Sequence, residues 1–179
     1  MGRHEIIDRP PRTIMEVYKM LPEGTLAELI DGVIYMSPSP ISNHQRVLTK
    51  LSASLHDFLN EKNLGELFVA PLDVYLDENS NAIQPDIIFV ASQNSSIVKD
   101  HIHGVPDMLI EILSPSNKDY DRLQKKELYE RFGVKEYWII DPATKEAIGY
   151  KLNAKNQYEE FSRSTAEINS VLLNRHFAF

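Results

Sequence analysis

The fold is decided by two stretches, IQPDIIFV at residues 83–90 and DMLIEILS at residues 107–114. Both are short runs with apolar residues on both faces, which is typical of central strands covered on both sides of a sheet. Each run contains one carboxylate, Asp86 in the first and Glu111 in the second. We therefore predict two neighbouring buried strands that each carry an acid.

The sequence before these strands predicts a hairpin and a helix. LAELI and VIYMS flank Asp31-Gly32, the dipeptide favoured at a type I′ turn. Residues 42–45 (SNHQ) have the pattern of a capping box, with a hydroxyl at its start and a glutamine at its end. Apolar residues follow at helical spacing until the helix ends near Gly65: Val47, Leu48, Leu51, Leu55, Phe58 and Leu59.

The remaining stretches complete an α/β pattern. We predict strands at 67–76 (LFVAPLDVYL) and 136–141 (EYWIID), and a helix at 119–132 (DYDRLQKKELYERF). Segments 147–152 and 157–162 predict a terminal hairpin. The order indicates a mixed central sheet flanked by helices, with one β-hairpin on the N-terminal side and another on the C-terminal side.

Length and composition limit the class of protein. A chain of 179 residues that is 42% hydrophobic suffices for one core and is short for two, so we expect a single domain over residues 1–179. The absence of cysteine leaves oxygen and imidazole as the metal ligands. No stretch has the apolar core of a signal peptide or the roughly 18 apolar residues of a membrane span. We expect a soluble cytoplasmic protein.

The net charge of −7, with a pI near 5.4, argues against a protein that coats nucleic acid non-specifically. Phosphate binding draws most of its affinity from lysine and arginine. A small basic surface is still compatible with a negative total, and a site for divalent cations needs carboxylates of its own.

The two acids indicate a metal site. Burying an ionised carboxylate is costly unless a cation or several donors compensate. For either acid alone, a carboxylate that caps a neighbouring loop is an equal alternative. Adjacent strands lie about 4.8 Å apart, however, so Asp86 and Glu111 could direct both side chains to one cation. Oxygen-only ligation favours Mg²⁺ or Mn²⁺ over zinc.

Lys125 is the third candidate. At about 100° per residue, it falls at the centre of the apolar arc that includes Leu128, Tyr129 and Phe132. A lysine that faces the core is uncommon unless it is paired, although a stem that runs along the apolar surface is the alternative. Lys125 should then lie close to the two acids, whereas Lys126 should be exposed to solvent.

These residues resemble the Uma-two family of the PD-(D/E)XK nuclease superfamily. The resemblance covers about residues 26–152, and the combination of its stretches is more specific than any one of them. The matching stretches are ELIDGVIYMSPSP at 28–40, HQ at 44–45, APLDVYL at 70–76, QPDIIFV at 84–90, PDMLIEILSPS at 106–116 and DRLQKKELYERFGVKEYWIIDP at 121–142.

The resemblance implies a restriction-endonuclease-like fold and a role for each motif residue. Pro85-Asp86 matches the PD motif and Glu111 the acid of (D/E)XK. Leu113 stands where the superfamily's basic pattern has its lysine, and Lys125 matches the position to which similar families move it. The resemblance also implies that an early glutamate, here Glu28, is an additional metal ligand.

Other polar and aromatic residues have plainer alternatives. Glu28 and His44 are second-tier candidates for a direct role at the site, but Glu28 in a hairpin is more often solvated, and His44 in the first helical turn can hydrogen-bond near the cap. Gln84 shares a strand face with Asp86 and either orients a ligand or water or bonds a neighbouring strand. His101 and His103 form an H-x-H pattern, for which a surface loop is the better interpretation. Core packing is the better interpretation for three aromatic residues: Tyr120, Tyr129 and Trp138.

The leading hypothesis is a Mg²⁺- or Mn²⁺-dependent phosphodiesterase that acts on DNA. Asp86 and Glu111 would hold the metal, and Lys125 would position the attacking water or stabilise charge on the phosphate. Two alternatives stay open. One is a catalytically silent nuclease-like domain that binds nucleic acid or a protein partner, and the other is a hydrolase of small phosphodiesters. The sequence also leaves the oligomeric state open, a homodimer included.

Overall fold

A computed structural model describes residues 9–114 and 121–179 of the chain. Its centre is a six-stranded sheet in the order β11-β10-β9-β8-β6-β3. Neighbouring strands are antiparallel except β8 and β9, which are parallel. The strands are β3 (Gly65–Val69), β6 (Ile87–Ala91), β8 (Met108–Ile112), β9 (Glu136–Ile140), β10 (Glu146–Leu152) and β11 (Tyr158–Thr165).

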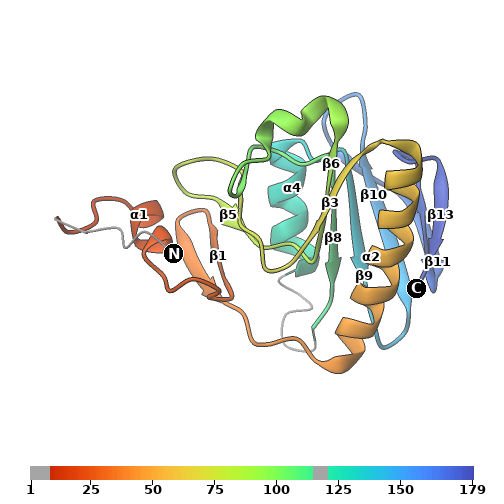
Figure 1. Cartoon of the computed structure of the whole chain (residues 1–179), viewed down its shortest axis with the longest axis horizontal. Coiled ribbons are helices and arrows are strands. Elements are labelled where there is room, and N and C mark those ends of the chain that lie inside the picture. Colours follow the sequence, from red (N-terminus) through yellow and green to blue (C-terminus); the bar gives the residue numbers. More distant parts are fainter. Residues whose placement is uncertain (1–8, 115–120) are drawn as a thin grey trace.

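Helices cover both faces of this sheet. In Figure 1 the sheet is seen nearly edge-on, with α2 (Ser42–Lys62) on one side and α4 (Lys126–Phe132) on the other. A π-helical turn, η2 (Asp121–Lys125), leads directly into α4, and Gly133 ends it in a left-handed conformation. The sheet flanked by helices confirms the predicted α/β class. No helix in residues 9–114 or 121–179 is long and apolar enough to cross a membrane.

A second sheet of five strands lies beside the first, in the order β2-β1-β5-β4-β7. The predicted hairpin forms its edge, and Asp31 and Gly32 both have the positive φ of a type I′ turn. Helix α1 (Ile14–Lys19) packs on this sheet through Met15 and Tyr18. The strands are β1 (Ala27–Ile30), β2 (Val33–Met36), β4 (Val74–Tyr75), β5 (Ala82–Ile83) and β7 (Ile102–His103).

Two of the predicted strands are each divided between the two sheets. The run predicted at 67–76 becomes β3 and β4, and the run at 83–90 becomes β5 and β6. Pro71 lies in the first break and Pro85 in the second. Because proline lacks the N–H that a central strand needs, each break is where the chain leaves one sheet for the other.

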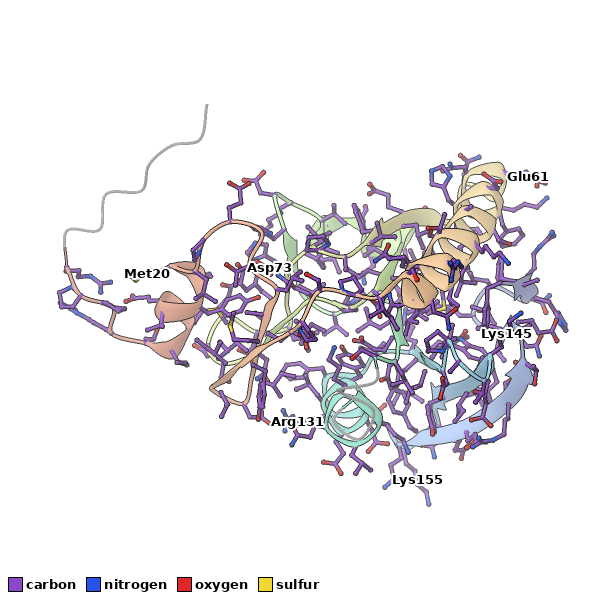
Figure 2. All side chains as sticks on the ribbon, turned by 90° about the horizontal axis from the view of Figure 1, so that it is seen from below. Met20, Glu61, Asp73, Arg131, Lys145 and Lys155 are labelled. Carbon is purple, nitrogen blue, oxygen red and sulfur yellow. The ribbon has the colours of Figure 1, made fainter. Side chains whose placement is uncertain are left out.

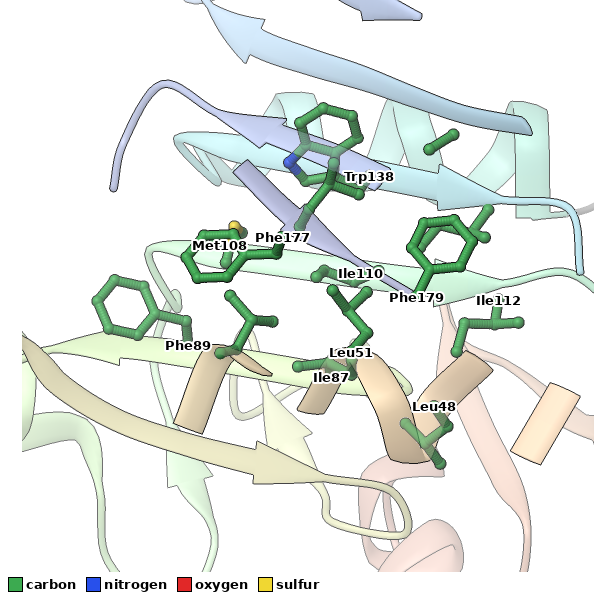
Figure 3. Close-up of a cluster of buried hydrophobic side chains, with 14 of the residues drawn as sticks. Leu48, Leu51, Ile87, Phe89, Met108, Ile110, Ile112, Trp138, Phe177 and Phe179 are labelled. Carbon is green, nitrogen blue, oxygen red and sulfur yellow. The ribbon is translucent and has the colours of Figure 1, made fainter. Parts of the chain in front are cut away.

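Alternating residues of the large sheet fill two hydrophobic layers. Ile87 and Phe89 pack against α2, whereas Ile88 and Val90 pack in the layer that contains Leu128 of α4. The C-terminal hairpin consists of β12 (Glu167–Ser170) and β13 (Arg175–Ala178). Phe177 in β13 and Phe179, directly after it, close the first layer (Figure 3). The same alternation sends Glu111 toward α4, since its neighbours Ile110 and Ile112 face α2.

Other differences concern the ends of elements. The hairpin predicted at 147–152 and 157–162 is present as β10 and β11, but β10 also pairs with β9 and so extends the central sheet. The hairpin β12–β13 and helix α1 were not predicted. The predicted helix at 119–132 begins outside the described residues, and from Asp121 it is helical to Phe132.

Candidate active site

One pocket of about 190 Å³ brings together every candidate site residue from the sequence. It lies where the small sheet, the large sheet, the start of α2 and the η2–α4 helix meet. Its lining includes Glu28 from β1, His44 from α2, Gln84 and Asp86 from the segment between β5 and β6, Glu111 from β8, and Lys125 from the end of η2.

The Lys125 ammonium lies between two glutamates. Its Nζ is 2.9 Å from Oε1 of Glu111 and 3.0 Å from Oε1 of Glu28. The three side chains are only 5–6% exposed. Charges so deeply buried are tolerated only when paired and hydrogen-bonded, so this ion cluster is a built feature of the core.

The helical phase used to choose Lys125 holds because the π-helical turn ends at that residue and an α-helix follows. Leu128 and Tyr129, three and four residues on, are buried on the same side. Lys126 differs from its prediction. It is partly buried, and its Nζ lies 4.3 Å from the centroid of the Tyr150 ring, because its stem runs along that apolar surface.

Tyr129 also belongs to the site, although core packing was predicted for it. Its hydroxyl donates to Oε1 of Glu111 at 2.6 Å, the same oxygen that Lys125 contacts. Burial, and then the Glu111 carboxylate, hold the pKa of Tyr129 well above its usual value, so it stays a neutral donor. The apolar spacing of the helix accounts for its burial, and nothing in the sequence distinguishes its hydroxyl from that of a packing residue.

Asp86 is oriented by two elements. It precedes β6, whose Ile87 pairs with Ile110, so Asp86 lies opposite Glu111 across two adjacent strands. Its Oδ2 accepts the backbone N–H of Ile112 at 2.7 Å, and its Oδ1 lies 3.0 Å from Nε2 of His44. The side chain remains 15% exposed, three times the value for Glu111. Asp86 is therefore the acid of this strand pair more accessible to a ligand.

Glu28 is buried, unlike most hairpin glutamates. Its Oε1 accepts the backbone N–H of Gln84 at 2.9 Å as well as the contact from Lys125. The Gln84 side-chain amide donates to Oδ1 of Asp73 at 2.9 Å and to the Thr25 carbonyl at 3.2 Å. Gln84 therefore acts on the ion cluster through its backbone, while its amide nitrogen ties the small sheet together.

His44 lies in the first turn of α2, but the predicted capping box is wrong. Ile41 is the N-cap, and it makes no side-chain capping bond. Ser42 is already helical, so its hydroxyl is past the position from which a cap accepts. The helix therefore begins at Ser42, one residue earlier than a Ser42 cap would allow, and the His44 ring in its first turn lies beside Asp86.

The predicted surface loop holds for His101, which precedes strand β7 and is 45% exposed, whereas His103 lies within β7. Each of the two histidines has an acidic neighbour. Nδ1 of His103 is 2.6 Å from Oε1 of Glu78, and Nδ1 of His101 is 3.9 Å from Oδ2 of Asp73. Asp73 is labelled in Figure 2, on the side of the molecule toward α1. Neither histidine lines the pocket that holds Lys125.

The pocket has the donor chemistry of a hard divalent cation but is not arranged around one. Glu28, Asp86 and Glu111 supply carboxylate oxygens, and the single ammonium of Lys125 offsets only one of their formal charges. Within the described ranges 9–114 and 121–179, no three histidine, aspartate or glutamate side chains converge at metal-binding spacing. The residues fit Mg²⁺ or Mn²⁺ in kind and charge.

Fold and pocket together define a nuclease-like α/β protein. A family model described as "Putative restriction endonuclease", Uma2, matches residues 14–174, and the chain belongs to this family. The fold is similar to a crystal structure from Anabaena variabilis ATCC 29413 of a "putative nuclease belonging to DUF820". That likeness has a TM-score of 0.75 at 19% identity and covers 94% of this chain and 95% of the other. No curated protein matches the chain.

Proposed function

We propose that the protein is a metal-dependent endonuclease that hydrolyses DNA phosphodiester bonds. The observation that carries the proposal is the convergence of Asp86, Glu111 and Lys125 in one pocket of a chain from this family. In this role residues 1–179 act as one nuclease domain, in the cytoplasm, where DNA is accessible.

Asp86 and Glu111, with Glu28, would hold Mg²⁺ or Mn²⁺. The bound metal supplies a polarised phosphoryl oxygen and a water of lowered pKa. His44 fixes the orientation of Asp86 through the contact between Nε2 and Oδ1. Tyr129 does the same for Glu111 through its hydroxyl. These contacts support a preorganised pair of acids, which is what an oxygen-ligated metal needs.

Lys125 would act on the reacting groups. An ammonium within the pocket can position the attacking water by donating a hydrogen bond to its oxygen. It can also neutralise charge that develops on the phosphate. Its burial strengthens either interaction, because the surrounding dielectric is low. Either role requires the Lys125 ammonium, which contacts Glu28 and Glu111, to reach the phosphate as well.

Cleavage assays test this function. Supercoiled plasmid and linear DNA are incubated at low salt with Mg²⁺, Mn²⁺ or EDTA, using the wild type and Asp86→Asn. We expect nicking that needs a divalent ion and is lost in the variant. With a net charge of −7, binding should be weak, with a shallow dependence of log K on log salt. Sedimentation measures the oligomeric state, including the homodimer that the sequence left open.

A second candidate is a catalytically silent domain that binds nucleic acid or a protein partner. The observation that favours it is the pairing of Lys125 with both glutamates, together with Leu113 in the usual position of the lysine. No cleavage over a range of pH, metals and substrates, combined with retained DNA binding, would select this candidate.

A further inference from the structure

The spacing of the ion cluster is that of an ammonium ion and not of a metal. Oε1 of Glu28 and Oε1 of Glu111 lie 3.0 and 2.9 Å from Nζ of Lys125. Mg²⁺ binds carboxylate oxygens at roughly 2.0–2.1 Å. A metal that replaced Nζ at the same point would therefore be too far from both oxygens, and the two carboxylates would have to close in by roughly 0.9 Å each.

The ammonium meets the same need that a metal would meet. Two glutamates buried in one pocket repel one another unless a cation lies between them. Lys125 supplies that cation from within the chain, and its side chain is as buried as theirs. The ammonium thus contacts both glutamates without any added ion, and it offsets one of their two formal charges.

We propose that Lys125 and the divalent cation compete for Glu28 and Glu111, so that metal binding displaces the lysine ammonium into the pocket. The inference rests on the proposed function and deepens it. In the metal-free protein the ammonium holds the two carboxylates. When the metal takes them, Nζ loses its contacts with these two glutamates and can turn to an anionic group in the pocket, of which a phosphodiester is the expected one.

Tyr129 allows the exchange without loss of the acid. Its hydroxyl bonds the same Glu111 oxygen that Lys125 contacts. The tyrosine lies on α4 and is fully buried, with its ring edge against Tyr137 at a centroid distance of 4.9 Å. Glu111 therefore keeps one anchor when the ammonium leaves. Lys125 itself is the last residue of the π-helical turn η2, directly before α4.

The first test is calorimetric titration of Mn²⁺ into the wild type, Lys125→Met and the control Lys126→Met. Methionine keeps the length of the stem and removes the charge. We expect Lys125→Met to bind Mn²⁺ about tenfold to a hundredfold more tightly, the range in which the contacts of a metal ligand change affinity. Lys126→Met removes the same charge from the same helix and should bind as the wild type does.

An equal or weaker affinity in Lys125→Met, or no binding in either protein, would overturn the competition. If Lys126→Met tightens binding as much, the effect is one of general charge and the proposal also fails.

The second test needs only the wild type and so survives a variant that does not fold. Lysine ammonium groups are observed by ¹H–¹⁵N correlation spectra, in which a buried and hydrogen-bonded NH₃⁺ is protected from exchange. We expect one protected signal in the metal-free protein that disappears or shifts on saturation with Mg²⁺. A signal unchanged at saturation would refute displacement.

These outcomes separate the inference from the function. An unchanged ammonium signal with intact DNA cleavage would remove the exchange and leave the nuclease. Displacement of the ammonium without cleavage of any DNA would remove the nuclease and leave the exchange.

Discussion

Two of the clusters of acids and cations in the described residues differ in burial. The pocket cluster comprises Glu28, Asp86, Glu111 and Lys125, and its side chains are at most 15% exposed. The rim cluster comprises Lys19, Asp73, Glu78, His101 and His103, and its side chains are 20–56% exposed. Contact distances are similar, such as 2.9 Å in the pocket and 3.0 Å for Lys19 and Glu78.

The comparison teaches that the contribution of such a cluster to stability depends on its burial and not on its number of charges. Exposed ion pairs contribute about 0–1 kcal/mol because solvent screens them. Removing one partner of a buried pair costs about 3–5 kcal/mol, because the other charge is left uncompensated. The sequence contains acids and histidines in both regions, so only the structure distinguishes the buried cluster from the exposed one.

The largest effect should come from Lys125→Ala. It leaves two buried glutamates without their ammonium, so we expect a loss of about 3–5 kcal/mol in the free energy of unfolding without metal. Turnover should be abolished. Urea denaturation and the plasmid assay measure the two effects. Lys126→Ala, on the same helix, should change stability by less than about 1 kcal/mol, and an equal loss there would contradict the burial argument.

Removal of the acids should abolish metal binding. Asp86→Asn and Glu111→Gln each delete a proposed ligand, and both should leave the fold intact. Relief of carboxylate repulsion predicts a higher metal-free melting temperature for Asp86→Asn. For Glu111→Gln that rise is not expected, because Lys125 already compensates Glu111 at 2.9 Å. Calorimetric titration of Mn²⁺ tests the loss of metal binding, and an unchanged affinity in both variants would contradict the proposed metal site.

Tyr129→Phe should have an intermediate effect. The change removes the 2.6 Å hydrogen bond to Glu111 but keeps the ring in the core. A buried acceptor that loses a donor costs about 1–3 kcal/mol of stability. Metal affinity should fall about tenfold, as when the outer contacts of a ligand are removed. Tyr137→Phe is a matched aromatic control, and comparable metal affinity in the two variants would exclude a positioning role for Tyr129.

The smallest effect should come from Glu78→Gln in the rim cluster. Hydrogen bonds from His103, and then from Lys19, hold the pKa of Glu78 below its usual value. A depressed folded-state pKa gives stability that is present above the unfolded pKa, near 4.5, and is lost as pH falls through the lower folded value. The variant should lose less than about 1 kcal/mol near pH 7 and show a flatter decline in acid. Melting temperatures at several pH values test this, and a loss as large as that of Lys125→Ala would contradict it.

The sequence was sufficient for the central strands because their cause is local. β6 and β8 are runs of buried residues whose composition alone favours a covered strand, and Gly133 marks the end of α4. Helix α1 could also have been predicted. Thr13 caps it by accepting the backbone N–H of Glu16, and a threonine followed three residues later by a glutamate is a capping-box pattern.

The site itself depended on contacts that the sequence does not contain. Glu28 could be proposed as a ligand only by resemblance, because its burial comes from β1 packing near a helix nearly 100 residues away. The hydrogen bond from Tyr129 to Glu111 likewise joins α4 to β8, and the spacing of residues along the sequence does not predict that these two side chains meet. Helical phase located Lys125, but of its two partners Glu28 lies in the small sheet and Glu111 in the large one, so the phase does not identify both.

The segment between β5 and β6 has a consequence for the order of folding. The short segment of residues 84–86 connects β5 of the small sheet to β6 of the large one, and it carries Gln84 and Asp86. The ion cluster draws Glu28 from one sheet, Glu111 from the other and Lys125 from a helix. Contacts so distant along the chain close late, after the loop entropy has been overcome. We therefore expect a partly folded chain to lack the cluster, so that the proposed site for a divalent ion would form late in assembly.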